Sequence, residues 1–181
     1  QIKHFCSLKF TEDELNYLKK IEWLHEDYID HLRLWNARYE DFTISTDSEC
    51  GFALDAKGTW LNTSMYEIPV LAIINEVFFR MSYTYDSLFE SYKKHLNEKT
   101  QWLIDGKYNL GNFSEFGLRR RLSAQAQDLA VKTLIENNSK YKESRCVGTS
   151  NVYLAKKYNV TPVGTMAHEF IMCVGQGNPM Y

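Results

Sequence analysis

The sequence has little of what marks the simpler classes of protein. Its 181 residues include only 3 prolines and 9 glycines, which excludes collagen-like, linker-like and low-complexity structure. The longest fully apolar stretch, residues 68–74, is far shorter than the roughly 20 residues of a membrane-spanning helix. The first residues, 1–4, are not followed by the apolar core of a signal peptide. We therefore expect a cytoplasmic protein with no membrane partner.

The sequence also has no large excess of charge of either sign. The sequence has 21 Lys and Arg residues against 23 Asp and Glu residues, a net charge of −2, so a strong positive field for nucleic acid is not expected. Its 4 cysteines lie far apart without a CxxC pair, which excludes a zinc ribbon and a thioredoxin motif. We expect reduced thiols, since 4 cysteines are too sparse for a disulfide scaffold.

Familiar catalytic motifs are incomplete or missing. His168-Glu169 begins an HExxH zinc motif, but Met172 stands where the second histidine is needed. The sequence contains no GxxxxGK[ST] or GxGxxG loop and no GxSxG elbow. A zinc protease, a P-loop nucleotide-binding protein and a hydrolase with a nucleophile elbow are thereby disfavoured.

The first half of the chain predicts an α+β arrangement. Thr11 and Glu14 form a capping-box pattern, followed by helical spacing over residues 12–38 that fits one long helix or two short ones. Pro69 occupies a position typical of the first turn of a helix, and a second helix is expected over 86–103. Strands are expected at 42–45, at 51–54 and, beginning a third, at 58–61.

The second half predicts alternating strands and helices. Strands are expected at 112–116, 146–149 and 163–166, with helices at 119–138 and 152–158. This βαβαβ order favours parallel strands. We place the boundary near 105–108 and expect two domains, 1–106 and 107–181. A closed (β/α)8 barrel takes about 250 residues, so these units would be the first part of a barrel and the chain a piece of a larger enzyme.

Arginines follow the first of these strands. Arg119, Arg120 and Arg121 come directly after Phe116 and Gly117, where β/α folds place their active sites. Three cations at a predicted helix start oppose the helix dipole, which suggests a bound anion. A basic surface turn paired with acidic residues is the alternative interpretation.

Small polar residues follow the other two strands. Thr149, Ser150 and Asn151 come after the second strand, and Thr165 lies at the end of the third. Their hydroxyl and N–H groups could bind a ligand, although Thr149 or Ser150 could instead cap the next helix. His168 beside Glu169 is a candidate nucleophile or proton carrier, or else a structural histidine.

Three motifs in this order and spacing carry a family resemblance. They are residues 116–121 (Phe-Gly-Leu-Arg-Arg-Arg), 148–151 (Gly-Thr-Ser-Asn) and 161–169 (Thr-Pro-Val-Gly-Thr-Met-Ala-His-Glu). Together they resemble nicotinate phosphoribosyltransferase, most closely the ATP-coupled bacterial and fungal enzymes. Residues 67–73 (Glu-Ile-Pro-Val-Leu-Ala-Ile) resemble that family's amino-terminal domain, so the resemblance extends over nearly the whole chain.

The resemblance implies a fold and a reaction. The fold would be a partial irregular (β/α) barrel of the type II phosphoribosyltransferase kind, preceded by an α+β amino-terminal domain. The reaction would join nicotinate to 5-phosphoribosyl 1-pyrophosphate, giving nicotinate mononucleotide and pyrophosphate for NAD biosynthesis. ATP would be hydrolysed through a phosphohistidine, with Mg²⁺ as cofactor. A homodimer is compatible with the family, and the family's remaining site segments would lie outside residues 1–181.

The resemblance also implies roles for single residues. His168 would carry the phosphoryl group, with Glu169 orienting its ring. Phe116 would stack on the pyridine ring, and Thr165 would contact nicotinate. The charge for the leaving pyrophosphate would come from the arginines 119–121, and Thr149, Ser150 and Asn151 complete the expected substrate contacts.

Two alternatives remain open at this point. A related enzyme acting on nicotinamide or quinolinate would use the same barrel, although the arginine run favours a carboxylated pyridine and the quinolinate family lacks this histidine. The excised chain could also be a non-catalytic α/β interaction module.

Overall fold

The computed structural model describes residues 1–46, 51–165, 172 and 175. The chain divides into two compact units. Unit 1 comprises Gln1–Lys94 and Gly117–Gln127, and unit 2 comprises His95–Phe116 and Asp128–Tyr181. The boundary expected between residues 106 and 107 stays a prediction. No helix in the described part of the chain is long and apolar enough to cross a membrane.

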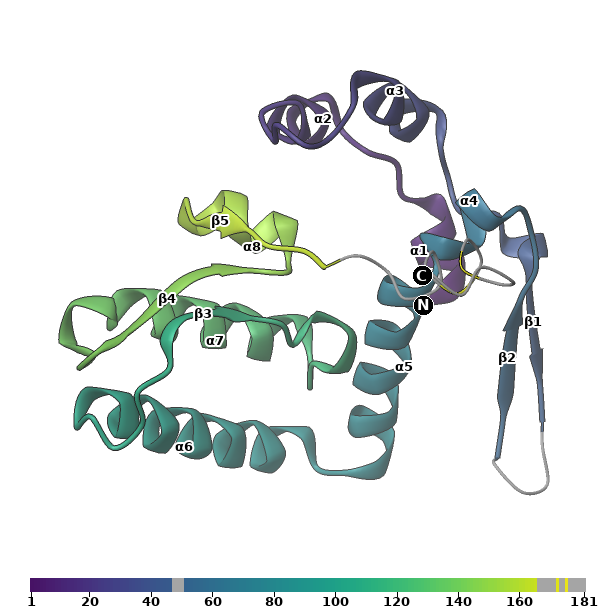
Figure 1. Cartoon of the computed structure of the whole chain (residues 1–181). Helices are drawn as coiled ribbons and strands as arrows, with labels where there is room; N and C mark the ends of the chain where they lie inside the picture. The colour runs from purple at the N-terminus through teal and green to yellow at the C-terminus, as the bar shows by residue number, and fades with distance from the viewer. Residues whose placement is uncertain (47–50, 166–171, 173–174, 176–181) are drawn as a thin grey trace. The chain divides into compact units, whose positions relative to one another are not determined.

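Unit 1 is mostly helical and carries one β-hairpin (Figure 1). Its helices are α1 (Ile2–Ser7), α2 (Glu12–Leu18), α3 (Glu26–Leu34), α4 (Trp60–Ser64) and α5 (Glu67–Ser82). The hairpin pairs β1 (Phe42–Ser45) with β2 (Ala53–Ala56) in antiparallel register, and the short 3-10 helix η1 (Tyr39–Asp41) precedes it. The helix α6 (Tyr85–Ile104) begins in unit 1, and the 3-10 helix η2 (Leu118–Arg120) also belongs to it.

The helical stretch near the amino terminus forms two short helices. Thr11 caps α2 with the predicted capping box: its hydroxyl accepts from the Glu14 N–H at 3.3 Å, and the Glu14 carboxylate accepts from the Thr11 N–H at 2.7 Å. The two helices then pack their apolar faces together and bury Leu15, Ile29 and Leu32. Two short helices can form this core because the apolar residues of each helix lie on one face.

A second apolar cluster joins α1, the hairpin and α5. It buries Ile2, Phe42, Tyr66 and Val70. Pro69 lies in the first turn of α5, as predicted, where its missing N–H costs no helical hydrogen bond. The strand expected from residue 58 is wrong, because α4 begins at Trp60. Four residues are too few for the apolar pattern to distinguish a strand from a helix.

Unit 2 holds the parallel sheet. Its strands β3 (Gly111–Glu115), β4 (Ser144–Thr149) and β5 (Thr161–Pro162) are ordered β3-β4-β5. The connections contain the end of α7 (Ala124–Glu136), the 3-10 helix η3 (Asn138–Lys140) and α8 (Val152–Tyr158). All described pairs are parallel, which confirms the predicted βαβαβ order. The third strand lies two residues earlier than expected, since Thr161 and Pro162 pair with Gly148 and Thr149.

One irregularity in this sheet positions the site. Phe113 pairs with Cys146, but Ser114 pairs with Gly148, so the register shifts by one residue of β4. Such a bulge re-aims the side chains beyond it, often next to functional sites. Here it brings Glu115 opposite Thr149 at the carboxyl ends of both strands.

Candidate functional site

The carboxyl ends of the three parallel strands meet at one edge of the sheet (Figure 1). In parallel α/β sheets this edge carries the ligand-binding residues. Three predicted site segments follow these strand ends: Phe116 after β3, residues 150–151 after β4, and Thr165 three residues after β5. Phe116 is 50% exposed and Thr165 is also exposed, so both are accessible to a ligand.

Glu115 and Thr149 form the centre of this edge. The Thr149 hydroxyl donates to the Glu115 carboxylate at 2.6 Å, and Thr149 is fully buried with 0% exposure. The Glu115 main-chain carbonyl accepts from the Ser150 N–H at 2.8 Å. One residue of β3 therefore holds both the last residue of β4 and the residue after it.

The turn from β4 to α8 is fixed by further bonds. The Asn151 N–H donates to the Thr149 hydroxyl at 3.1 Å, and the Val163 N–H donates to the Thr149 carbonyl at 3.0 Å. Asn151 then caps α8, because its side-chain oxygen accepts from the Leu154 N–H at 3.2 Å. The sequence left Thr149 or Ser150 as alternative caps; the cap is Asn151 instead.

The three arginines belong to unit 1 and are not at a helix start. Arg119 and Arg120 lie in η2, and α7 begins only at Ala124. Ser123 provides the start of α7, since its hydroxyl accepts from the Ala126 N–H at 3.0 Å. The predicted helix from residue 119 is therefore wrong at its beginning, and the helix dipole gives no argument for a bound anion there.

Acidic residues of α5 hold the arginine segment. The Arg119 guanidinium forms an ion pair with Glu67, and its carbonyl accepts from the Asn75 side chain at 2.9 Å. Glu76 accepts from the Ala124 N–H at 3.1 Å. The alternative of a basic turn paired with acids thus describes Arg119 well.

The other two arginines differ from Arg119. Arg121 is half-buried, and its Nη1 lies 3.3 Å from the Gln127 side-chain oxygen. Its Nε is buried and has no hydrogen-bond partner among the described residues. Burial lowers the pKa of Arg121, opposed by the charge of Glu76; the guanidinium nevertheless remains protonated. Arg120 is exposed and forms no ion pair within the described part of the chain.

Comparison with known proteins places this geometry in a family. The family model described as the nicotinate phosphoribosyltransferase (NAPRTase) N-terminal domain matches residues 1–75, and the nicotinate phosphoribosyltransferase (NAPRTase) family model matches residues 112–181. The two matches follow one another along the chain and together include most of it. The chain belongs to the nicotinate phosphoribosyltransferase family. The resemblance carried by the three motifs is confirmed.

Curated relatives match along nearly the full chain. The nicotinate phosphoribosyltransferase of Ralstonia nicotianae is 38% identical over 173 residues, and that of Neisseria gonorrhoeae is 35% identical over 177 residues. Both alignments include 94% of this chain but 43% of the relative. The chain thus spans less than half the length of the curated relatives it matches.

Solved structures of nicotinate phosphoribosyltransferases share the fold. That from Porphyromonas gingivalis has a TM-score of 0.81 at 28% identity, with 96% of this chain and 43% of that chain covered. That from Vibrio cholerae has a TM-score of 0.78 at 26% identity, with 94% and 40% covered. The predicted class, a type II phosphoribosyltransferase fold with an α+β amino-terminal part and a parallel sheet, is confirmed.

Two of the family residues predicted from the motifs cannot be placed. His168 and Glu169 lie outside the described residues. The roles expected for Phe116, Thr165 and the arginines stay predictions. The sequence argument gave no role to Glu115, although a carboxylate directly before Phe116 in the first motif was a visible signal. It also missed Glu67 and Glu76, because the residues that pair with them lie about 50 positions away.

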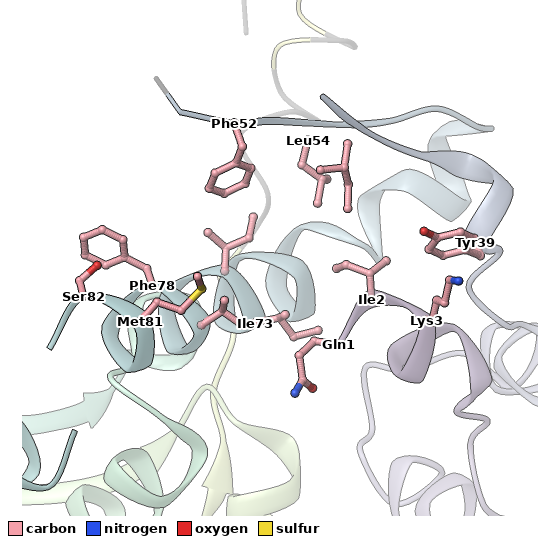
Figure 2. A pocket seen from close by; sticks show the side chains of 13 residues that line it. Gln1, Ile2, Lys3, Tyr39, Phe52, Leu54, Ile73, Phe78, Met81 and Ser82 are labelled. Carbon is pink, nitrogen blue, oxygen red and sulfur yellow. The ribbon is translucent and has the colours of Figure 1, made fainter. Parts of the chain in front are cut away.

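A large concave surface lies elsewhere, in unit 1. It is a groove of about 620 Å³ between the hairpin region and α5, with walls formed by Phe52, Leu54, Ile73, Phe78 and Met81. Figure 2 shows the Phe52 and Leu54 side chains on one side and those of Ile73, Phe78 and Met81 on the other. Most of the lining of the groove is apolar, although Gln1, Lys3 and Ser82 also line it, and it includes none of the predicted site residues.

Proposed function

We propose that the full-length protein carrying this chain is a nicotinate phosphoribosyltransferase of NAD biosynthesis. Its substrates are nicotinate and 5-phosphoribosyl 1-pyrophosphate. The bond from ribose C1 to the pyrophosphate oxygen breaks, the bond from C1 to the pyridine nitrogen forms, and pyrophosphate leaves. The observation that best supports this function is that Phe116, the turn after β4 and Thr165, which all lie inside the match of the family model, follow the carboxyl ends of the parallel strands β3, β4 and β5.

Positive charge is the first requirement of this reaction, because both the pyridine carboxylate and the leaving pyrophosphate are anions. Arg120 is the arginine of the motif best placed to supply it, since it is exposed and lacks an ion pair in the described part. The positive charge of Arg119 is partly neutralised by its ion pair with Glu67. Phe116 offers an exposed aromatic face for the pyridine ring, and Thr165 a hydroxyl.

Mg²⁺ is proposed to enter with the donor. No group of three His, Cys, Asp or Glu residues in the described part could hold a metal ion. Mg²⁺ commonly binds through substrate phosphates and keeps several waters. It would neutralise part of the pyrophosphate charge, and no residue of this chain is assigned to it.

The proposal includes ATP as co-substrate. The bond from the γ-phosphorus of ATP to the bridging oxygen breaks, the γ-phosphoryl group moves to a ring nitrogen of His168, and ADP leaves. Glu169 orients that ring, and water later hydrolyses the phosphohistidine to free histidine and inorganic phosphate. Support comes from the motif of residues 161–169, which lies inside the match of the family model. A cytoplasmic homodimer is also part of the proposal, and light scattering after gel filtration measures the oligomeric state.

Turnover with three pyridines tests the function. We expect the full-length protein with MgATP and the phosphoribosyl donor to form nicotinate mononucleotide from nicotinate, with little product from nicotinamide or quinolinate. The neutral amide lacks the carboxylate that the arginines bind, and quinolinate carries a second carboxylate. Preferred turnover of either competitor would overturn the assignment.

Intact-mass measurement under non-acidic conditions tests the histidine. After incubation with MgATP, we expect the wild type to gain one phosphate and His168→Asn to gain none. The matched control is His95→Asn, because His95 lies on α6 and outside the three family motifs, and this variant should still be phosphorylated. Phosphate on His168→Asn, or on neither protein, would contradict the ATP-coupled mechanism.

A further inference from the structure

One helix, α5, holds both ends of the chain segment 119–124, which contains the three arginines. Asn75 and Glu76 are neighbours on α5, and each binds a main-chain group of this segment. The Asn75 side chain donates to the Arg119 carbonyl at 2.9 Å, and the Glu76 carboxylate accepts from the Ala124 N–H at 3.1 Å. The main chain between these two contacts is therefore fixed from one helix.

Glu76 is itself held in place by a residue of its own helix. The Arg80 guanidinium donates to the Glu76 carboxylate at 3.1 Å from Nε and at 2.9 Å from Nη2. The same guanidinium lies 4.1 Å from the centre of the Tyr85 ring. The Tyr85 hydroxyl donates to that of the fully buried Ser123 at 2.5 Å. One network of contacts thus links α5 and α6 to the start of α7.

The Glu76 carboxylate also determines which groups can bind a substrate anion here. Anions bind at helix N-termini because the first N–H groups of a helix have no partner within it. At the start of α7 two of these groups already have partners, since Ala124 donates to Glu76 and Ala126 donates to the Ser123 hydroxyl. The arginine side chains are therefore the better anion-binding groups, and their positions follow from the main chain that α5 holds.

We propose that Asn75 and Glu76 are positioning residues, which fix the main chain of segment 119–124 so that the Arg120 guanidinium meets the anionic substrates. In this arrangement neither residue touches a substrate. Arg120 depends on its main chain because the described part of the chain contains no ion pair that orients its exposed side chain. This inference rests on the proposed function of the full-length protein.

Steady-state kinetics of the full-length protein with nicotinate, the phosphoribosyl donor and MgATP test this role. We expect Asn75→Ala and Glu76→Ala each to lower kcat/KM for nicotinate by about fivefold, the loss of roughly one hydrogen bond. Glu76→Gln keeps one acceptor oxygen for the Ala124 N–H, so its loss should be less than about twofold.

The matched control is Asn137→Ala. Asn137 is half-buried like Asn75, and its side chain donates to the Thr133 carbonyl at 2.9 Å. This variant therefore removes the same kind of hydrogen bond outside segment 119–124. We expect its kcat/KM for nicotinate to stay within about twofold of wild type.

A double-mutant cycle shows whether Asn75 acts through Arg120. Arg120→Ala alone should lower kcat/KM for nicotinate by at least about 10-fold, because it removes a charged donor to the anionic substrates. Adding Asn75→Ala to Arg120→Ala should have no further effect, because both changes remove the same interaction. A purely structural role of Asn75 would make the two effects multiply.

Limited trypsin digestion with mass mapping measures the position of the segment without any activity. Trypsin cleaves after arginine where the chain opens locally. Cleavage after residues 119–121 should be at least about threefold faster in Asn75→Ala and Glu76→Ala than in the wild type and in Asn137→Ala.

Three kinetic results would overturn the proposal. They are a kcat/KM for nicotinate within twofold of wild type in Asn75→Ala, the same result in Arg120→Ala, or multiplying effects in the double mutant. If the wild type transfers no phosphoribosyl group, the proposed function fails instead. The trypsin rates then decide alone whether α5 fixes the segment, and unchanged cleavage in Asn75→Ala and Glu76→Ala would contradict it.

Discussion

At the scale of single residues, Gly148 shows how closely β4 and β5 approach. A Cβ added at Gly148 would lie 2.1 Å from the Thr161 carbonyl oxygen and 2.9 Å from the Val163 side chain. The nearer atom belongs to the main chain, so the strand itself would have to move. We expect Gly148→Ala to lower the free energy of unfolding by about 2–3 kcal/mol in denaturant titrations.

Gly164 provides the control for that prediction. A Cβ at Gly164 would have nothing within 4 Å, so Gly164→Ala should change the free energy of unfolding by no more than about 0.5 kcal/mol. Equal destabilisation by both substitutions would mean that alanine is harmful for another reason than the approach of Thr161.

Tyr66 illustrates a buried hydroxyl that is hydrogen-bonded to a carboxylate. Tyr66 is 2% exposed, and its hydroxyl donates to the Asp41 carboxylate at 2.7 Å. Tyr66→Phe removes this hydrogen bond to the carboxylate, so we expect a loss of about 1–2 kcal/mol in the free energy of unfolding at pH 7.

The same residue predicts a pH dependence. Burial, together with the hydrogen bond to Asp41, raises the pKa of Tyr66 from 10 to about 12. A raised pKa gives stability that is fully present below the unfolded value near pH 10 and is lost as the pH approaches 12. Over this window the wild type should lose stability more steeply than Tyr66→Phe in pH-jump unfolding experiments. The pKa of Tyr141 is also raised to about 12 by burial. Because Tyr141 is present in both proteins, its contribution to the pH dependence is the same in each and does not affect the comparison. Parallel pH profiles would contradict the expected shift.

At the scale of elements, Asp128 joins α7 to α8. Its carboxylate accepts from the Lys157 ammonium at 2.8 and 2.9 Å and from the Tyr158 hydroxyl at 2.9 Å. Burial raises the pKa of Asp128, but the bonds from Lys157 and Tyr158 outweigh it and leave the pKa lowered. The contribution to stability is therefore present above the unfolded pKa and is lost as the pH falls through the lower folded value.

Thermal unfolding of Asp128→Asn checks this linkage between helices. At pH 7 we expect it to be less stable than the wild type by about 1 kcal/mol or less, since the pair is partly exposed and screened by solvent. The difference should shrink as the pH falls below about 4, where the unfolded carboxyl becomes protonated. A difference in stability between the wild type and Asp128→Asn that persists at low pH would mean that the charged carboxylate does not cause it.

The elements that sequence could predict are those with their own local signals. The capping box of Thr11 and Glu14 and the position of Pro69 determine helix starts within a few residues, and both are confirmed. The arginine segment was placed in a helix too early because its first turn is set by Ser123 and by contacts to Glu76, which lies 48 positions from Ala124. Local periodicity contains no information on such distant partners.

At the scale of the whole molecule, a short motif is divided between two compact units. Phe116 clusters with unit 2, while Gly117 and the three arginines cluster with unit 1. The sequence could identify the motif as continuous, because its residues are adjacent and its composition is unusual. It could not show this division, which depends on which distant residues each half packs against. The Glu115–Thr149 bond was hidden in the same way, since it requires a one-residue register shift that no pattern of apolar residues specifies.

The order of the parallel sheet has a consequence for how the chain is made. Among the described residues β3 pairs with β4 and β4 with β5, so spatial order equals chain order. Domains fold from the amino terminus as synthesis proceeds at about 5–20 residues per second. Each new strand therefore emerges next to the free edge of the strand before it, and no earlier pair has to open. The sheet can be extended during translation, one strand at a time, as the ribosome delivers it.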